Sequence, residues 1–259
     1  IHYNLLFDKA EKAVSDDEQK LTRVKEARLP ILIAEIQIAG QIPVGQKGSF
    51  YTINDNGNVI PKPYMKKKVE EFVASAKKAG IQRIGERAIT IDDYAENFKR
   101  MFKKMEEMDQ AISFKKNIIA ISEPTFGKAN LARLTDGVFG AFESWRFPDK
   151  DANWVAYKGK HMDFILDLGA VMPIKSIEID FLNVQAQANW HQLILPKFVT
   201  YAISPDGVKY SDPIQINNPH NPNPAENPDI IKLPFLTFKT IYSKTKGRYL
   251  KVHAESELK

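Results

Sequence analysis

The spacing of apolar residues changes near residue 112, and this change constrains the fold more than any other feature of the sequence. Before it, apolar residues recur every three or four positions, which is the period of a helix with one buried face. After it, they alternate with polar residues, as in a strand with one buried face. A chain of 259 residues is also long enough for two domains. The sequence therefore predicts a multidomain protein, with an all-α helical domain over residues 1–112 and an all-β domain over residues 113–259.

Four helices are expected in the helical domain. The second begins after a capping sequence at residues 15–18. Pro30 is expected to kink or end this helix, although the apolar residues from Ile31 to Ile38 continue as if it resumed in a buried place. Gly80 is expected to end the third helix, and Thr90 to cap the fourth. Residues 54–58, rich in Asn, indicate a loop or a hairpin turn. The first helix carries apolar residues at helical spacing, namely Tyr3, Leu6, Phe7, Ala10 and Val14.

The β domain is expected to consist of short strands separated by Gly, Pro and Asn turns, which is typical of an antiparallel sandwich or barrel. The first long strand is expected to end at a turn formed by Asp167, Leu168 and Gly169. The Asn- and Pro-rich residues 217–229 are interpreted as an excursion between two strands. The alternating apolar residues are Met162, Phe164, Leu166 and Leu168, then Ile177, Ile179 and Phe181, then Val199, Tyr201 and Ile203.

Composition excludes several classes of protein. The net charge of +5 is spread evenly, so a nucleic-acid partner is not predicted. There is no cysteine, which excludes disulfides, thiolate chemistry and cysteine-based zinc sites. No run of about 18 apolar residues indicates a membrane span, and the given residues are not expected to include a signal peptide. Because the first residue is Ile1, the chain is interpreted as a processed or excised part of a longer protein.

Several motifs of the β domain resemble the discoidin, or coagulation factor V/VIII type C, family, which includes the family 32 carbohydrate-binding modules. In chain order they are "LTDG" at residues 134–137, then Trp154 and Gly159, then "DFILDLG", "IKSIEIDFL" and "NWHQLILPKFVTYAISPDG". The resemblance implies a galactose-binding-like jelly roll in which loops at one end form the ligand surface. It also implies that Trp154 seals that end by packing beneath its loop.

The same resemblance implies a structural calcium ion near the Asp-Gly dipeptide, with Asp136 as a ligand. Calcium prefers six to eight oxygen ligands, and one carboxylate supplies few of them. The alternative is an Asx-type turn, in which the carboxylate of Asp136 binds the backbone of its own loop.

The helical domain carries a second resemblance, through "LLFDKAEKAVSDDEQKLTRVKEARLPILIAEI" and "VEEFVASAKKAGIQRIGER". These stretches are similar to the helical region that follows the barrel in glycosidase-like proteins of gut Bacteroidetes, a family of unassigned function related to alpha-glucuronidases. The resemblance implies that this chain is the C-terminal part of an exported protein acting on glycans. The catalytic barrel of that protein would then be a missing partner domain of the same chain.

Two loops of the β domain carry the residue types that bind sugars. Sugar sites combine an aromatic platform with a few planar polar groups. One loop supplies Trp145 with Arg146, and the other supplies Trp190 with Gln187, Asn189 and His191. The alternative for each tryptophan is that it packs beneath its loop.

Catalysis by this chain is not favoured by the sequence. A glycoside hydrolase needs two carboxylates about 5 to 9.5 Å apart across a cleft, and nothing marks a pair among Glu143, Asp149, Asp151 and Asp163. The sequence lacks G-x-S-x-G, H-E-x-x-H and P-loop motifs. The favoured function is non-catalytic carbohydrate binding. The alternatives are a structural or interaction domain that buttresses the missing barrel and, last, a glycoside hydrolase.

Overall fold

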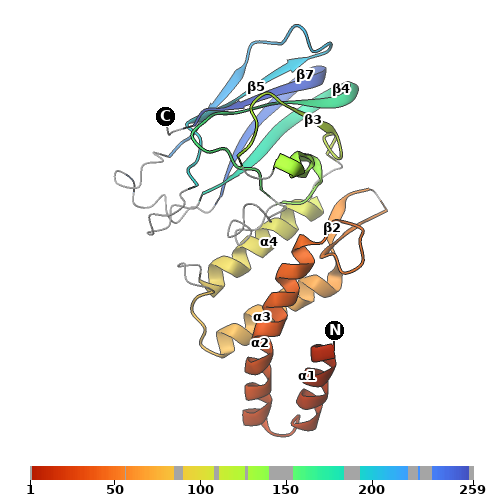
Figure 1. Ribbon diagram of the computed structural model, residues 1–259, viewed down its shortest axis with the longest axis vertical. Coiled ribbons are helices and arrows are strands. Elements are labelled where there is room, and N and C mark those ends of the chain that lie inside the picture. Colours follow the sequence, from red (N-terminus) through yellow and green to blue (C-terminus); the bar gives the residue numbers. More distant parts are fainter. Residues whose placement is uncertain are drawn as a thin grey trace. The chain divides into compact units, whose positions relative to one another are not determined.

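The computed structural model of the chain describes residues 2–55, 57–84, 90–107, 111–125, 128–139, 154–183, 193–220, 227 and 235–256. Internal contacts divide the chain into two compact units, Ile1–Gln110 and Ala111–Lys259, and both are drawn in Figure 1. None of the helices in the described ranges combines the length and the apolar character that crossing a lipid bilayer requires.

The first unit contains four helices and a small sheet. Its elements are α1 (His2–Ala13), α2 (Glu18–Gln41), β1 (Tyr51–Ile53), β2 (Val59–Pro61), α3 (Pro63–Lys78) and α4 (Ile91–Glu107). The prediction of an all-α region is therefore wrong in one place, because β1 and β2 pair antiparallel. Their turn is built by Asn54, whose side chain accepts a hydrogen bond from the N–H of Asn58 at 2.9 Å. Gly57 supplies the positive φ of 81°.

The C-terminus of α3 and the N-terminus of α4 confirm the roles predicted for Gly80 and Thr90. Gly80 adopts a φ of 72° just after α3, and the N–H of Ile81 then reaches the carbonyl of Ala76 at 2.9 Å. At the start of α4, the hydroxyl of Thr90 accepts from the N–H of Asp93 at 3.0 Å. The carboxylate of Asp93 accepts from the N–H of Thr90 in return at 3.1 Å, which completes a capping box.

Pro30 does not end α2, which continues from Glu18 to Gln41. Proline removes one helix hydrogen bond, but the apolar residues on either side of it keep the helix seated. Leu29, Leu32, Ile36 and Ala39 are all buried. The N-cap of this helix is Asp17, whose side chain accepts from the N–H of Lys20.

The contact between α1 and α2 includes a network of polar side chains. Arg28 of α2, with its side chain 12% exposed, binds Asp8 at 2.9 Å and Glu11 at 2.8 Å on α1. Asn4 of α1 also binds Arg28, at 3.2 Å, and contacts Glu35. Of the apolar stripe that the sequence predicted here, Phe7, Ala10 and Val14 are half-buried. Three large apolar residues of α1 are instead exposed, namely Tyr3, Leu5 and Leu6.

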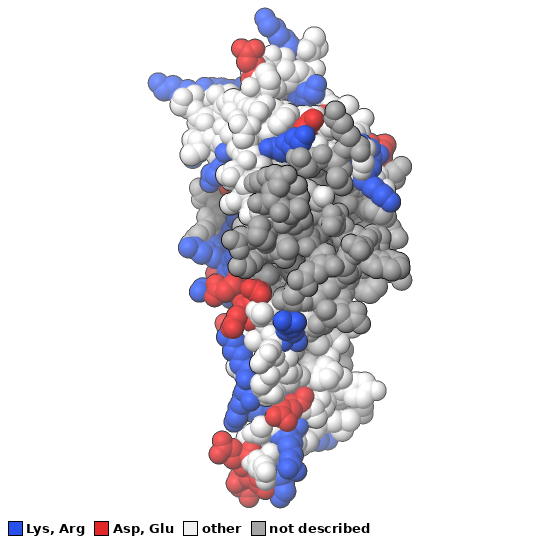
Figure 2. Space-filling view, turned by 90° about the vertical axis from the view of Figure 1, so that its left-hand side faces the viewer, with Lys and Arg blue, Asp and Glu red and all other residues white. Residues whose placement is uncertain are grey.

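Charges on the molecular surface are mixed. On the face shown in Figure 2, acidic and basic side chains lie interspersed. Pairs such as Lys66 with Glu106 and Lys77 with Asp92 join neighbouring elements of the first unit. Exposed pairs of this kind contribute little to stability, about 0 to 1 kcal/mol each.

The second unit is built on an antiparallel sheet with the strand order β3-β4-β7-β5-β6. Its elements are β3 (Asn117–Ala120), the 3-10 helix η1 (Lys128–Thr135), β4 (Met162–Leu182), β5 (Phe198–Ser204), β6 (Ile214–Asn217) and β7 (Phe235–Ala254). The long strands β4 and β7 pair over most of their length, and they lie side by side in Figure 1.

The sequence predicted that the first long strand ends at Gly169, and this prediction is wrong. The strand continues to Leu182, and its pairing with β7 shifts register between Asp167 and Met172 and again between Ile174 and Ser176. Gly169 has a φ of 83° within this bulge, which explains why the local sequence has the composition of a turn. Bulges bend a strand and increase its twist.

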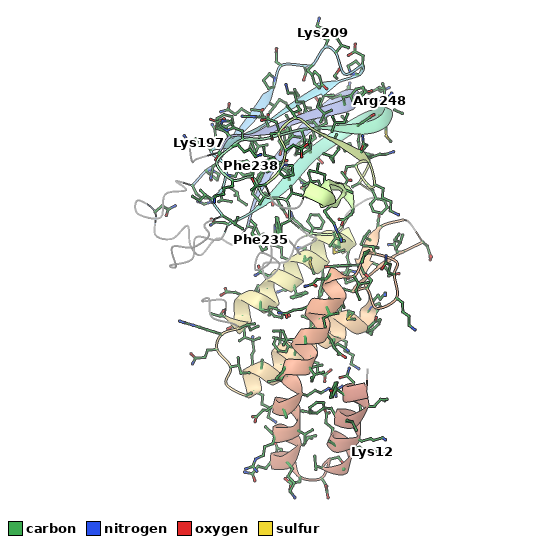
Figure 3. All side chains as sticks on the ribbon, viewed as in Figure 1. Lys12, Lys197, Lys209, Phe235, Phe238 and Arg248 are labelled. Carbon is green, nitrogen blue, oxygen red and sulfur yellow. The ribbon has the colours of Figure 1, made fainter. Side chains whose placement is uncertain are left out.

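Beyond the bulges, the β4–β7 ribbon packs against the sheet and forms the second layer of a β-sandwich. The hydroxyl of Tyr201 in β5 donates to the backbone carbonyl of Phe238 in β7 at 2.9 Å. Phe181 of β4 meets the ring of Phe238 edge-on, with ring centroids 5.3 Å apart. Phe238 is labelled in Figure 3. The two layers share one core, which includes Phe164, Leu166, Leu168, Ile174, Val199, Tyr201, Ile203, Phe238, Leu250 and Val252.

Asp167 links the β4 bulge to β7 through Arg248. This ion pair predicts that the free energy of unfolding of the second unit depends on pH. Arg248 donates to both carboxylate oxygens, at 2.8 and 2.9 Å, and this pairing is the main reason that the pKa of Asp167 falls to about 2. A lowered pKa stabilises the fold above the unfolded-state pKa of about 3.9. We therefore expect this contribution to disappear as the pH falls from about 4 to about 2.

The measurement is urea denaturation at several pH values between 2 and 6, with unfolding monitored by tryptophan fluorescence. All three tryptophans, Trp145, Trp154 and Trp190, belong to the second unit, so the signal reports this unit alone. Asp167→Asn should reduce the loss of stability across this pH range. If the variant and the parent lose stability equally, the Asp167–Arg248 pair is not the source of the pH dependence.

Candidate functional site

A small apolar cluster closes one end of the sandwich. It consists of Leu182 at the end of β4, Phe235 at the start of β7, Trp154 and Leu193, and it is called the loop-base cluster below. Leu182 and Phe235 are buried. The indole of Trp154 stacks on the ring of Phe235, with centroids 5.9 Å apart and planes at 18°. The packing role predicted for Trp154 is thus the one that the structure describes.

The residues of the loop-base cluster lie directly beside the two segments that carry the predicted sugar-binding residues. Trp154 directly follows residues 140–153, and Leu193 directly follows residues 184–192. Leu182 lies just before that second segment, separated from it only by the buried residue Asn183. Both segments that carry the predicted sugar-binding residues are therefore anchored at the same end of the sandwich.

The predicted ligand residues themselves lie outside the described residues. The structure describes the loop-base cluster beside them, but not the positions of these residues themselves. This applies to Trp145, Arg146, Gln187, Asn189, Trp190 and His191.

Asp136 forms the Asx-type turn that the sequence offered as the alternative to a calcium site. Its Oδ1 accepts from the N–H of Val138 at 2.8 Å, and its Oδ2 accepts from Arg133 at 3.1 Å. Burial raises the pKa of Asp136, and the hydrogen bonds from Val138 and Arg133 oppose this rise. Both carboxylate oxygens are thus used within the loop, and one of them faces a cation.

The calcium ion that the resemblance implies at this loop stays a prediction. Across the ranges that the structure covers, no three or more His, Asp or Glu side chains group in a way that could hold a metal ion. The Arg133 guanidinium beside Asp136 would also repel a divalent cation.

Chelation tests the calcium prediction directly. We expect EDTA to leave the thermal midpoint of the second unit unchanged, because Asp136 is already satisfied by Val138 and Arg133. The measurement is thermal unfolding followed by tryptophan fluorescence, with and without EDTA and with added Ca²⁺ or Mg²⁺. A midpoint that falls with EDTA and recovers with Ca²⁺ alone would instead establish a structural calcium ion.

Sequence reasoning missed a cluster of titratable side chains where β4 begins and β7 ends. His253 Nδ1 lies 2.8 Å from Asp163 Oδ1, and His253 Nε2 lies 3.1 Å from Glu255 Oε2. His161 Nδ1 lies 3.2 Å from the same Glu255 oxygen. Asp163 and His253 lie on the paired strands β4 and β7, and His161 and Glu255 lie just outside these strands. The strand register that pairs Asp163 with His253 cannot be read from the sequence.

This cluster does not form the carboxylate pair of a glycosidase. The imidazole of His253 fills the space between Asp163 and Glu255, so the two carboxylates do not face each other across an open cleft. The other candidate carboxylates, Glu143, Asp149 and Asp151, lie outside the described residues.

Neither a protein-family model nor a curated protein matches this chain. Among solved structures, it is similar to the C-terminal domain of a chitobiase from Bacteroides fragilis, with 15% identity, a TM-score of 0.35, and coverage of 57% of this chain and 87% of that one. A fucose binding module of Streptococcus pneumoniae has 14% identity, a TM-score of 0.36 and coverage of 57% and 85%. Chitosan-binding module 1 from a chitosanase/glucanase of Paenibacillus sp. IK-5 has 14% identity, a TM-score of 0.35 and coverage of 57% and 87%.

Proposed function

We propose that the second unit binds carbohydrate without catalysis, through side chains of residues 140–153 and 184–192. The observation that carries the proposal is the loop-base cluster, at which both segments are anchored on one end of a β-sandwich. The resemblance of the sequence to discoidin-like modules also supports this proposal, because in those modules the ligand surface lies on loops at one end of the sandwich. The proposed ligand residues are Trp145, Arg146, Gln187, Asn189, Trp190 and His191.

The chemistry of these residues suits a sugar. An indole face packs against the apolar C–H face of a pyranose, while the amides, the imidazole and the guanidinium bind hydroxyl groups. Binding is stronger when the protein groups are already in place, because less entropy is lost on association. The stack of Trp154 on Phe235 provides a packed base for both segments.

We further propose that the chain is the C-terminal part of a larger, exported protein that processes glycans. The support is the resemblance of the first unit to the helical region of glycosidase-like proteins. In that arrangement the binding unit would hold the glycan near a catalytic domain of the same chain, and increase its effective concentration there.

A glycan array with the intact chain tests the binding proposal. Trp190→Ala and Trp145→Ala should each weaken binding about 30-fold, because the loss of an aromatic contact at the centre of a site costs about 2 kcal/mol. Affinities for the glycans that bind should then be measured by calorimetry.

Lys209→Ala is the matched control. Lys209 is exposed, and Figure 3 places it at the opposite end of the second unit from Phe235. This variant should bind as the parent does. If the folded parent binds no glycan, the proposal fails. If it binds and both tryptophan variants retain full affinity, the site lies elsewhere on the chain.

A second candidate function is that of a structural or interaction domain. The specific observation in its favour is the exposed apolar surface of α1, where Tyr3, Leu5 and Leu6 are 63%, 57% and 51% exposed. Apolar side chains grouped on a surface are typical of protein contacts. A folded chain that is silent on the glycan array would favour this function.

A further inference from the structure

We draw no further inference here: the strongest candidate, the cluster of His161, Asp163, His253 and Glu255 where β4 begins and β7 ends, carries nothing because its side chains bind one another and, within the described ranges, form no group that could hold a metal ion.

Discussion

Replacing Phe238 with alanine is expected to lower the free energy of unfolding of the second unit by about 3–5 kcal/mol, the usual cost of removing a buried phenylalanine ring. Phe238 is 1% exposed and belongs to the core shared by both layers of the sandwich. Its ring packs against Phe181. The hydrogen bond from Tyr201 reaches only the backbone carbonyl, so the substitution removes the ring and leaves that donor's partner in place.

The measurement is urea denaturation followed by tryptophan fluorescence, which reports the second unit alone. Ile241→Ala is the matched control, because Ile241 lies on the same strand and is 77% exposed. Surface substitutions of this kind usually change stability by less than about 0.5 kcal/mol. Equal effects of the two variants would contradict the two-layer packing described above.

Gly247→Ala is expected to destabilise the second unit by about 3 kcal/mol, at the upper end of the usual cost of overpacking a core. A β-carbon at this position would lie 2.2 Å from Cγ2 of Ile203 and 3.3 Å from the carbonyl oxygen of Ser204. Ile203 is itself buried at 5% exposure, so its side chain has little space into which it can move. The clash therefore involves the core and not a flexible surface group.

A second substitution identifies the clash as the cause. Ile203→Leu removes the Cγ2 branch while roughly keeping the side-chain volume, so the double variant should recover part of the stability that Gly247→Ala loses. The coupling free energy from the four denaturation curves is the quantity to measure. Additive effects of the two substitutions would show that the β-carbon at position 247 does not meet Ile203.

The helical unit was largely predictable because its signals are local. Gly80 ends α3 and Thr90 caps α4 through contacts within a few residues, so the sequence alone contains the relevant partners. Pro30 was expected to kink or end α2, and the helix continues past it because Leu29 and Leu32 are buried, which depends on the helices packed around α2. The β1–β2 hairpin contradicts the all-α prediction, although its turn residues were noticed.

The candidate site was predictable only as a set of residue types. The sequence left Asp136 either as a calcium ligand or in an Asx-type turn; the structure shows the turn through Val138, and the calcium ion stays a prediction. The six proposed sugar-binding residues stay a prediction. The resemblance implied one shared end for the ligand loops, but the contact of Leu182 with Phe235 that anchors both segments is a tertiary one, because these residues come from distant parts of the chain.

The sequence by itself determined the helical segments, the main extended segments of the second unit and the positions of several backbone turns. It did so because helix periods, capping residues and glycines with positive φ act over a few positions. Only the tertiary structure decided that β4 and β7 are single bent strands and that Asp163 meets His253 across 90 positions. These contacts depend on strand register and on the burial of a shared core, and both are properties of the folded chain as a whole.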